Sequence, residues 1–309
     1  MSANPGLAND AAEFERHRRY LTGVAYRMLG TLADAEDVVQ DAYVRWHAAS
    51  PNTALENPRA YFAQIVTRLC LDRMKSAQAR RETYVGPWLP EPVVGAVLNE
   101  SAETEAECAN DISYALLLTL ERLSPLERAS FLLHDVFEYE FEQVAEILER
   151  SADSCRQLAS RAREHIRGER PRFQASVEAR RRLAEAFTAA TRTGDASTLA
   201  AILAEDVVFL SDGGGRVPAA INPIHGRDHV SRMIAGLGKR WRDLPQIRFA
   251  FAEINGLAGI IFYEDDKPFQ TMALEAAADG SIAAIYVMRN PDKLGHVPKL
   301  DEISQARPS

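Results

Sequence analysis

The sequence predicts a multidomain protein in which two all-α domains precede one α+β domain. Two observations support this prediction. Apolar residues recur every three or four positions up to about residue 83, and again from residue 112 to about residue 170. Past residue 172 two amphipathic helices are followed by short segments of alternating polar and apolar residues, which are typical of β-strands.

The composition limits the class of protein. A chain of 309 residues is long enough for two or three domains. Its first residues do not show the basic-then-apolar pattern of a secretion signal, so none is expected, and no apolar run approaches the roughly 18 residues of a membrane helix. The three cysteines, Cys70, Cys108 and Cys155, are far apart and form no CxxC pair. We therefore expect a cytoplasmic protein with no membrane contact, metal site or cofactor.

The charge distribution is more informative than the net charge of −8. Residues 68–81 contain five basic residues against one acid, and residues 156–172 contain six against two. Two basic stretches on an acidic protein could contact DNA at two places. The alternative is that each stretch is a solvated helix face, which is the commoner origin of a single charge run.

The first all-α domain is predicted over residues 1–83. Thr31 followed by Asp34 indicates a helix cap, and apolar residues then recur at helical spacing. Pro51 and Pro58 bracket a polar loop, and a second long helix is predicted from about Arg59.

Residues 84–111 are predicted to be a linker. Three prolines between residues 86 and 92 remove backbone donors and exclude a helix interior. The acidic stretch that follows them is interpreted as a tether.

The second all-α domain is predicted over residues 112–172. Ser124-Pro125-Leu126-Glu127 forms a capping box with proline at the first helical position. Two short helices, Glu140–Leu148 and Ala152–Arg167, are separated by three residues. The second helix has an apolar face that includes Cys155 and a basic opposite face. This combination predicts a helix-turn-helix, with an inert buried thiol at Cys155.

The α+β domain is predicted over residues 173–309. Two helices are expected at about Val177–Arg192 and Ala196–Ala204. Asp279-Gly280 indicates a hairpin between the last two strands. A meander over the helices, enclosing a cleft, is expected from the strands Val207–Ser211, Gln246–Ile254, Leu257–Tyr263, Pro268–Glu275 and Ile282–Arg289.

Three stretches resemble sigma factors of the extracytoplasmic-function type: residues 34–43, residues 58–73 and residues 123–167. The resemblance implies a role for each stretch. Residues 34–43 would dock on the polymerase clamp, residues 58–73 would melt the promoter and read the −10 element, and residues 123–167 would read the −35 element. It implies a region-2 bundle over residues 1–83 and a region-4 domain over residues 112–172. The implied partners are core RNA polymerase, through the β′ clamp and β flap, and promoter DNA. Core polymerase would then do the chemistry, and the chain itself would not be an enzyme.

The last third resembles the SnoaL-like domains of the NTF2-like superfamily, through Gly194-Asp195 and Glu205-Asp206-Val207. Such domains have a cone-like α+β fold. Three strings resemble the subgroup of sigma factors that carries this extension: Trp88-Leu89-Pro90-Glu91-Pro92, Asp212-Gly213-Gly214-Gly215-Arg216 and Asn290-Pro291-Asp292-Lys293-Leu294. In that subgroup the extension would regulate the sigma factor in cis.

Within the frame of this resemblance, candidate residues follow from spacing and chemistry. The predicted polymerase-binding residues lie on one helix face: Asp37, Gln40, Asp41 and Val44. The predicted −10 contacts are Asn57, Arg59, Tyr61, Arg68, Arg80 and Arg81. Tyr61 and Trp46 could instead be core aromatics, and core is favoured for Trp46. Arg68 stands where many relatives carry Asn.

The predicted −35 reader is the second helix of the helix-turn-helix. The base-contacting candidates at its start are Ser154, Arg156, Gln157, Ser160 and Arg161. Arg163 and Arg167 come later on the helix and are predicted to bind phosphates.

The C-terminal domain is predicted to act by docking. The segment Trp88, Leu89 and Pro90 would be received by two loops, made of Asp212, Gly213, Gly214, Gly215 and Arg216, and of Asn290, Pro291, Asp292, Lys293 and Leu294. Small-ligand sensing in the cleft ranks second, and catalysis by Asp212 with His225 and His229 ranks third. A plain flexible loop is the alternative to all three. For the whole chain, a SnoaL-like enzyme and a DNA-binding repressor are the rival functions.

Overall fold

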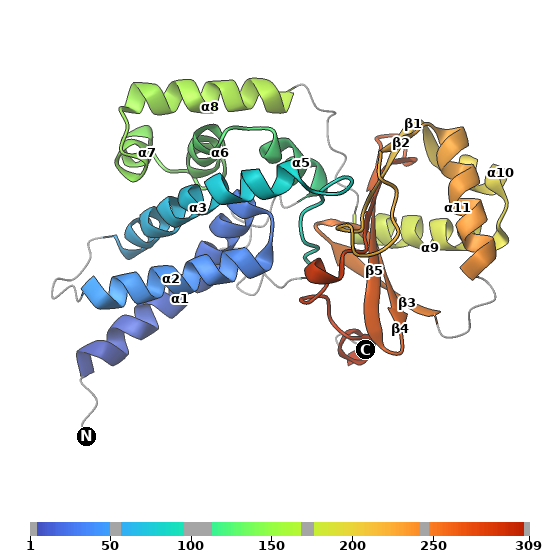
Figure 1. Cartoon of the computed structure of the whole chain (residues 1–309), viewed down its shortest axis with the longest axis horizontal. Helices are drawn as coiled ribbons and strands as arrows, with labels where there is room; N and C mark the ends of the chain where they lie inside the picture. The colour runs from blue at the N-terminus through green and yellow to red at the C-terminus, as the bar shows by residue number, and fades with distance from the viewer. Residues whose placement is uncertain (1–4, 50–56, 96–112, 168–175, 242–246, 306–309) are drawn as a thin grey trace. The chain divides into compact units, whose positions relative to one another are not determined.

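The computed structural model describes residues 5–49, 57–95, 113–167, 176–241 and 247–305 (Figure 1). The chain forms two compact units. The helical unit comprises Met1–Glu82 and Leu98–Glu169, and the sheet unit comprises Thr83–Val97 and Arg170–Ser309. Residues 84–95, which the sequence assigns to a linker, therefore belong to the sheet unit.

The first half of the helical unit contains α1 (Pro5–Leu29), α2 (Leu32–Ala49) and α3 (Pro58–Glu82). Thr31 stands at the predicted cap position, because its carbonyl accepts the helical bond from Ala35 N at 3.2 Å, and its Oγ1 donates to Asp34 Oδ2 at 2.7 Å. Aromatic rings join the three helices. The Phe62 centroid lies 5.0 Å from those of Phe14 and Trp46, so Trp46 is a core residue.

The second half of the helical unit has the predicted helix-turn-helix. Its helices are α5 (Tyr114–Glu121), α6 (Pro125–Phe131), the π-helical turn η1 (Leu132–Val136), α7 (Phe141–Leu148) and α8 (Ala152–Arg167). The capping box is confirmed, because the Ser124 and Glu127 side chains each bond the other's backbone N–H. Glu149 ends α7 in the left-handed conformation, which makes the tight turn into α8. Cys155 is buried, as predicted.

The sheet unit is an α+β fold. Helices α9 (Val177–Thr193), α10 (Ala196–Ala200) and α11 (Arg227–Trp241) share one core with a six-stranded sheet of order β2-β1-β6-β5-β4-β3 (Figure 1). The strands are β1 (Leu203–Asp212), β2 (Ile224–His225), β3 (Ile247–Ile254), β4 (Leu257–Glu264), β5 (Lys267–Ala276) and β6 (Ile282–Met288). A 3-10 turn, η2 (Pro291–Lys293), and α12 (Leu300–Gln305) follow.

Strands β3 to β6 form the predicted meander, but the start of the sheet differs from the prediction. The helix expected up to Ala204 ends at Ala200, and β1 begins at Leu203. Leu203 is buried and pairs with Ile282, because β1 runs parallel to β6. Helix α11, whose Val230 and Ile234 pack in the core, was not predicted with bounds from the sequence. The start of β1 and the position of α11 both depend on contacts with residues far away in the sequence.

Turns between the strands follow local chemistry. Asn255 and Gly256 join β3 to β4 with φ of 50° and 72°, as a primed hairpin turn requires. The hairpin predicted at Asp279-Gly280 is confirmed: Gly280 has φ of 84°, and Asp279 accepts from the backbone N–H of Ser281.

Candidate functional site

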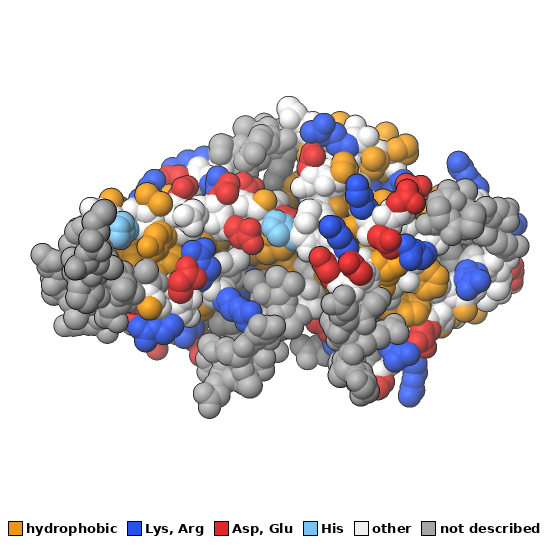
Figure 2. Space-filling model, turned by 90° about the horizontal axis from the view of Figure 1, so that it is seen from below, with side chains coloured by type: hydrophobic (Ala, Val, Ile, Leu, Met, Phe, Trp, Pro, Cys, Tyr) orange, Lys and Arg blue, Asp and Glu red, His pale blue; other side chains and the backbone are white. Residues whose placement is uncertain are grey.

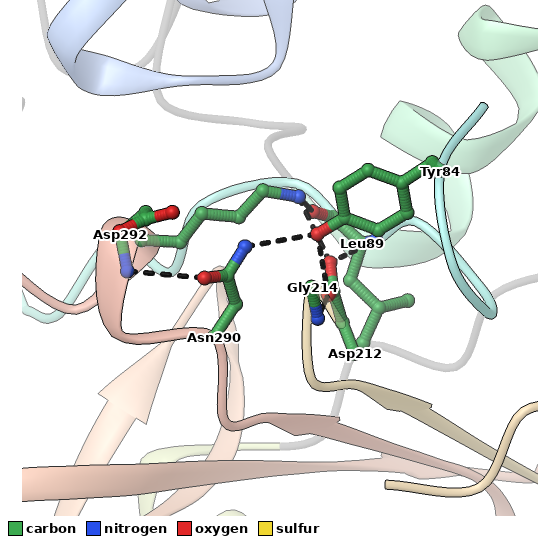
Figure 3. A network of polar contacts seen from close by, with 7 residues as sticks. Tyr84, Leu89, Asp212, Gly214, Asn290 and Asp292 are labelled. Atoms are coloured by element: carbon green, nitrogen blue, oxygen red, sulfur yellow. Dashed lines mark hydrogen bonds and ion pairs between the residues drawn. The ribbon is translucent and has the colours of Figure 1, made fainter. Parts of the chain in front are cut away.

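A buried carboxylate organises the end of β1. Asp212 has no exposed surface, and its Oδ1 accepts from Tyr84 Oη at 2.6 Å and from Gly214 N at 2.9 Å. Its Oδ2 accepts from Leu89 N at 2.9 Å and from Lys293 Nζ at 2.8 Å (Figure 3). A charge in the interior is tolerated only when it is paired and hydrogen-bonded. Asp212 meets both conditions through residues far apart in sequence.

Lys293 completes the hold on Leu89. Its Nζ donates to Leu89 O at 2.6 Å, so both the N–H and the C=O of Leu89 are bound by the sheet unit. The same ammonium lies 4.2 Å from the Trp88 ring centroid and 5.0 Å from that of Tyr84. We call this group, made of Asp212, Lys293, Tyr84 and the Leu89 backbone, the clamp.

Asn290 supports the clamp from the loop after β6. Its Nδ2 donates to Tyr84 Oη at 2.9 Å and its Oδ1 accepts from Asp292 N at 3.0 Å. Burial and the adjacent Asp212 carboxylate raise the pKa of Tyr84. The phenol therefore stays protonated and can donate to Asp212.

The glycine loop, Gly213–Gly215, lets the chain after β1 pass close to Val217 and to Asn290. A Cβ on Gly214, which has φ of 59°, would lie 2.3 Å from Asn290 Nδ2, and one on Gly213 would lie 2.4 Å from Val217 O. Gly215 faces the segment before Trp88, with Val85 side-chain atoms 3.3 Å from its virtual Cβ. Arg216 and Asp292 form an exposed ion pair at 3.2 Å.

A second set of contacts holds residues 91–95. Buried Glu91 contacts His296 Nδ1 at 2.5 Å. Val93 N donates to Asn255 Oδ1 at 3.0 Å and Val93 O accepts from Asn255 N at 2.9 Å. Val94 then forms a bridge with Ile254 at the edge of the sheet. Leu89, Pro90 and Val93 are buried as a result.

Tyr84, Asn255 and His296 belong to this site, although they were not predicted from the sequence. Asn255-Gly256 is a recognisable turn signal, but nothing local shows that its amide binds another segment. His225 and His229 are exposed, and the polar partners that the described residues provide for Asp212 include neither histidine. The geometry therefore does not favour an Asp–His catalytic pair at this position.

The acidic face predicted on α2 is on the surface. Asp37, Gln40 and Asp41 are exposed, and Val44 is 55% exposed. Asp37 accepts from Arg73 Nη2 at 3.2 Å and remains 67% exposed. The opposite face, with Val38 and Trp46, is buried.

The residues predicted near the −10 element lie in different surroundings. Asn57 caps α3 through Ala60 N at 3.1 Å, the Arg59 guanidinium lies 4.1 Å from the Tyr20 ring centroid, and Tyr61 is half-buried. The side chains of Arg80 and Arg81 lie outside the described part of the chain.

Arg68 contacts the helix-turn-helix instead of an open surface. Its Nε donates to Ile147 O at 3.3 Å and its Nη2 pairs with Glu149 at 2.8 Å, at the C-terminal end of α7. A cation is favourable at that end of a helix. The buried Arg128 makes a further link between the two halves of the helical unit, since its Nη1 donates to Met28 O at 2.6 Å.

The predicted reader residues of α8 lie on the surface, where several pair with acids. Arg156, Gln157, Ser160 and Arg161 are exposed, and Ser154 is half-buried. Three arginines have acidic partners, namely Arg156 with Glu142 and Asp153, Arg161 with Glu127, and Arg163 with Asp135. The Arg167 side chain lies outside the described part. On the face seen in Figure 2, basic and acidic side chains are likewise interspersed.

The helical unit matches two protein families: residues 14–80 match Sigma-70 region 2, and residues 113–166 match Sigma-70, region 4. The chain is 37% identical over 305 residues to the ECF RNA polymerase sigma factor SigJ of Mycobacterium tuberculosis, covering 96% of each protein. The chain belongs to the extracytoplasmic-function RNA polymerase sigma factors. This sigma factor therefore directs promoter-specific transcription initiation, as the resemblance implied.

The likeness extends through both units. The probable sigma factor SigI of M. tuberculosis is 31% identical over 292 residues, covering 92% of this chain and 94% of SigI. The crystal structure of M. tuberculosis SigJ matches with a TM-score of 0.72 at 35% identity, covering 92% of this chain and 97% of SigJ. The prediction of two sigma domains followed by an α+β domain is confirmed. Among the described residues, no helix has the length and apolarity to cross a membrane.

Proposed function

We propose that the sheet unit controls this sigma factor in cis by holding residues 83–97. The observation that supports this is the clamp, in which Asp212 and Lys293 bind the N–H and C=O of Leu89. The held segment follows directly on α3 of region 2 and precedes region 4 in the sequence. Because the sheet unit holds these residues, they cannot act as free linker when region 2 and region 4 engage their promoter elements.

The remaining functions belong to the helical unit. The surface of Asp37, Gln40, Asp41 and Val44 binds the β′ clamp of core RNA polymerase, and region 4 meets the β flap. The exposure of Val44 beside exposed acids supports the first contact. Core polymerase supplies the chemistry, so the chain has no enzymatic activity of its own and works in the cytoplasm.

Promoter DNA is read at two places. Helix α8 reads the −35 element through its exposed first turns, and Asn57, Arg59, Tyr61, Arg80 and Arg81 contact the −10 region. The contacts of Arg68 with the end of α7 support a different role for this residue, which is to hold region 2 against region 4.

Transcription in vitro tests control by the clamp. Holoenzyme is reconstituted from core polymerase and Lys293→Met, and transcripts are measured on a promoter selected with the wild-type protein. We expect a change of about fivefold or more, in the same direction as removal of all residues after Arg172. Lys299→Met, at an exposed lysine of the same unit, should leave transcription unchanged. Wild-type transcription by Lys293→Met would refute control through the clamp.

A further inference from the structure

Three groups surround the guanidinium of Arg156 near the start of α8. Nη2 donates to Glu142 Oε1 at 2.8 Å and Nη1 donates to Asp153 Oδ1 at 2.8 Å. The Phe141 ring lies under the guanidinium, with its centroid 5.4 Å from Cζ. Phe141 and Glu142 begin α7, whereas Asp153 lies on α8, so both helices of the helix-turn-helix contribute.

We infer that Glu142 is a positioning residue that determines sequence specificity, by orienting Arg156 to read one guanine of the −35 element. The inference rests on the proposed role of α8 as the −35 reader. A guanidinium has five N–H donors, and the two carboxylates engage one donor on each terminal nitrogen. The donors that remain are enough for a bidentate contact to O6 and N7 of guanine.

The aromatic platform is itself fixed. The Phe141 ring stacks on His134 with centroids 3.8 Å apart and an interplanar angle of 27°. His134 Nδ1 is in turn 2.8 Å from Tyr139 O. Arg156 is therefore held on a surface anchored in region 4, yet its side chain is 47% exposed and can meet DNA. Fixing a long side chain before binding reduces the entropy lost when it contacts a base.

The charge of Glu142 gives the inference a distinctive consequence. A carboxylate on a DNA-reading surface repels phosphates, so it lowers affinity for every sequence. A residue that orients Arg156 should also raise the preference for one base. Loss of the carboxylate should therefore increase binding to random DNA and decrease discrimination. A role confined to folding predicts no such opposite changes.

Four variants separate geometry from charge. Glu142→Gln removes the charge, and Glu142→Asp keeps it but shortens the reach to Arg156. Glu146→Gln makes the same charge change about one turn further along α7, where Arg156 has no contact. Arg156→Ala removes the reading group itself. Because the three wild-type side chains are exposed, circular dichroism should show native folds for all four variants.

The measurement is transcription by reconstituted holoenzyme from a template library with a randomised −35 window, with sequencing of the productive templates. Anisotropy with a random duplex measures nonspecific affinity. Wild type and Glu146→Gln should prefer guanine at one position, and Arg156→Ala should lose this preference. In Glu142→Gln and Glu142→Asp the preference should fall about fivefold or more. Only the two Gln variants should bind the random duplex more tightly.

Two outcomes are distinguishable failures. If Glu142→Gln and Glu142→Asp keep the guanine preference that Arg156→Ala loses, Arg156 reads a base without help from Glu142 and the inference is overturned. If Arg156→Ala keeps every base preference of the wild type, the assignment of Arg156 as a reader fails, and with it this part of the proposed function.

Discussion

The two units use charged side chains in opposite environments. In the sheet unit Asp212 and Lys293 are 0% and 8% exposed and bind one segment of backbone. In the helical unit Arg156 and Asp37 are 47% and 67% exposed, and each has an ion pair at the surface. Surface pairs contribute about 0–1 kcal/mol, and their exposed side chains remain able to contact DNA or polymerase. Removing one partner of a buried pair lowers the free energy of unfolding by about 3–5 kcal/mol, so the clamp is suited to hold a fixed contact.

The largest expected effect concerns the clamp. Lys293→Met leaves the buried Asp212 carboxylate without its cation, and we expect the sheet unit to lose about 3–5 kcal/mol of unfolding free energy. Urea unfolding of the full chain, followed by circular dichroism, measures this loss. Lys299→Met should change it by less than about 0.5 kcal/mol. A loss below about 1 kcal/mol for Lys293→Met would contradict the contrast between the units.

The acidic face of α2 gives the next effect. Asp37→Lys combined with Asp41→Lys should weaken core-polymerase binding by about tenfold or more, because like charges would then face a basic partner. The circular dichroism spectrum should stay native, since both side chains are exposed. Asp72→Lys, at another exposed acid, is the control. Native core binding by the double variant would exclude this interface.

A moderate effect is expected where the glycine loop supports the clamp. Gly214→Ala places a methyl group against Asn290, and Trp88→Ala removes the ring under Lys293. Each should shift transcription in the same direction as Lys293→Met, and the double variant should fall short of the sum, because both act on one network. Strictly additive shifts would mean that the loop and Trp88 act separately.

The smallest effect is expected for Arg163 on α8. Its guanidinium already bonds both Asp135 oxygens, at 2.7 and 3.1 Å, so DNA must compete with this pair. Arg163→Ala should weaken binding to all sequences equally and reduce the salt dependence by about one unit of slope. Arg156→Ala should instead relax base preference. If both variants lose affinity equally and neither changes base preference, the assignment of Arg156 to bases and Arg163 to phosphates is wrong.

The local parts of the structure could be predicted from the sequence. The bounds of α7 and α8, the capping box at Ser124 and the core position of Trp46 follow from helical period and cap chemistry, which act within a few residues. The four polymerase-face residues were found on one exposed face for the same reason. The family motifs lie in such stretches, so they could be recognised without a structure.

The tertiary structure decided the contacts that join distant residues. Leu203 starts a strand because Ile282 lies beside it. Tyr84 joins the clamp because folding brings it to Asp212, which lies 128 positions later in the chain. Arg68 was predicted to contact DNA, but its long side chain reaches the end of α7. Sequence by itself determined which residues could form helices, strands and turns, since those preferences depend on near neighbours. The partner of each polar side chain was set by the folded chain, because hydrogen bonds and ion pairs act over a few ångströms in space.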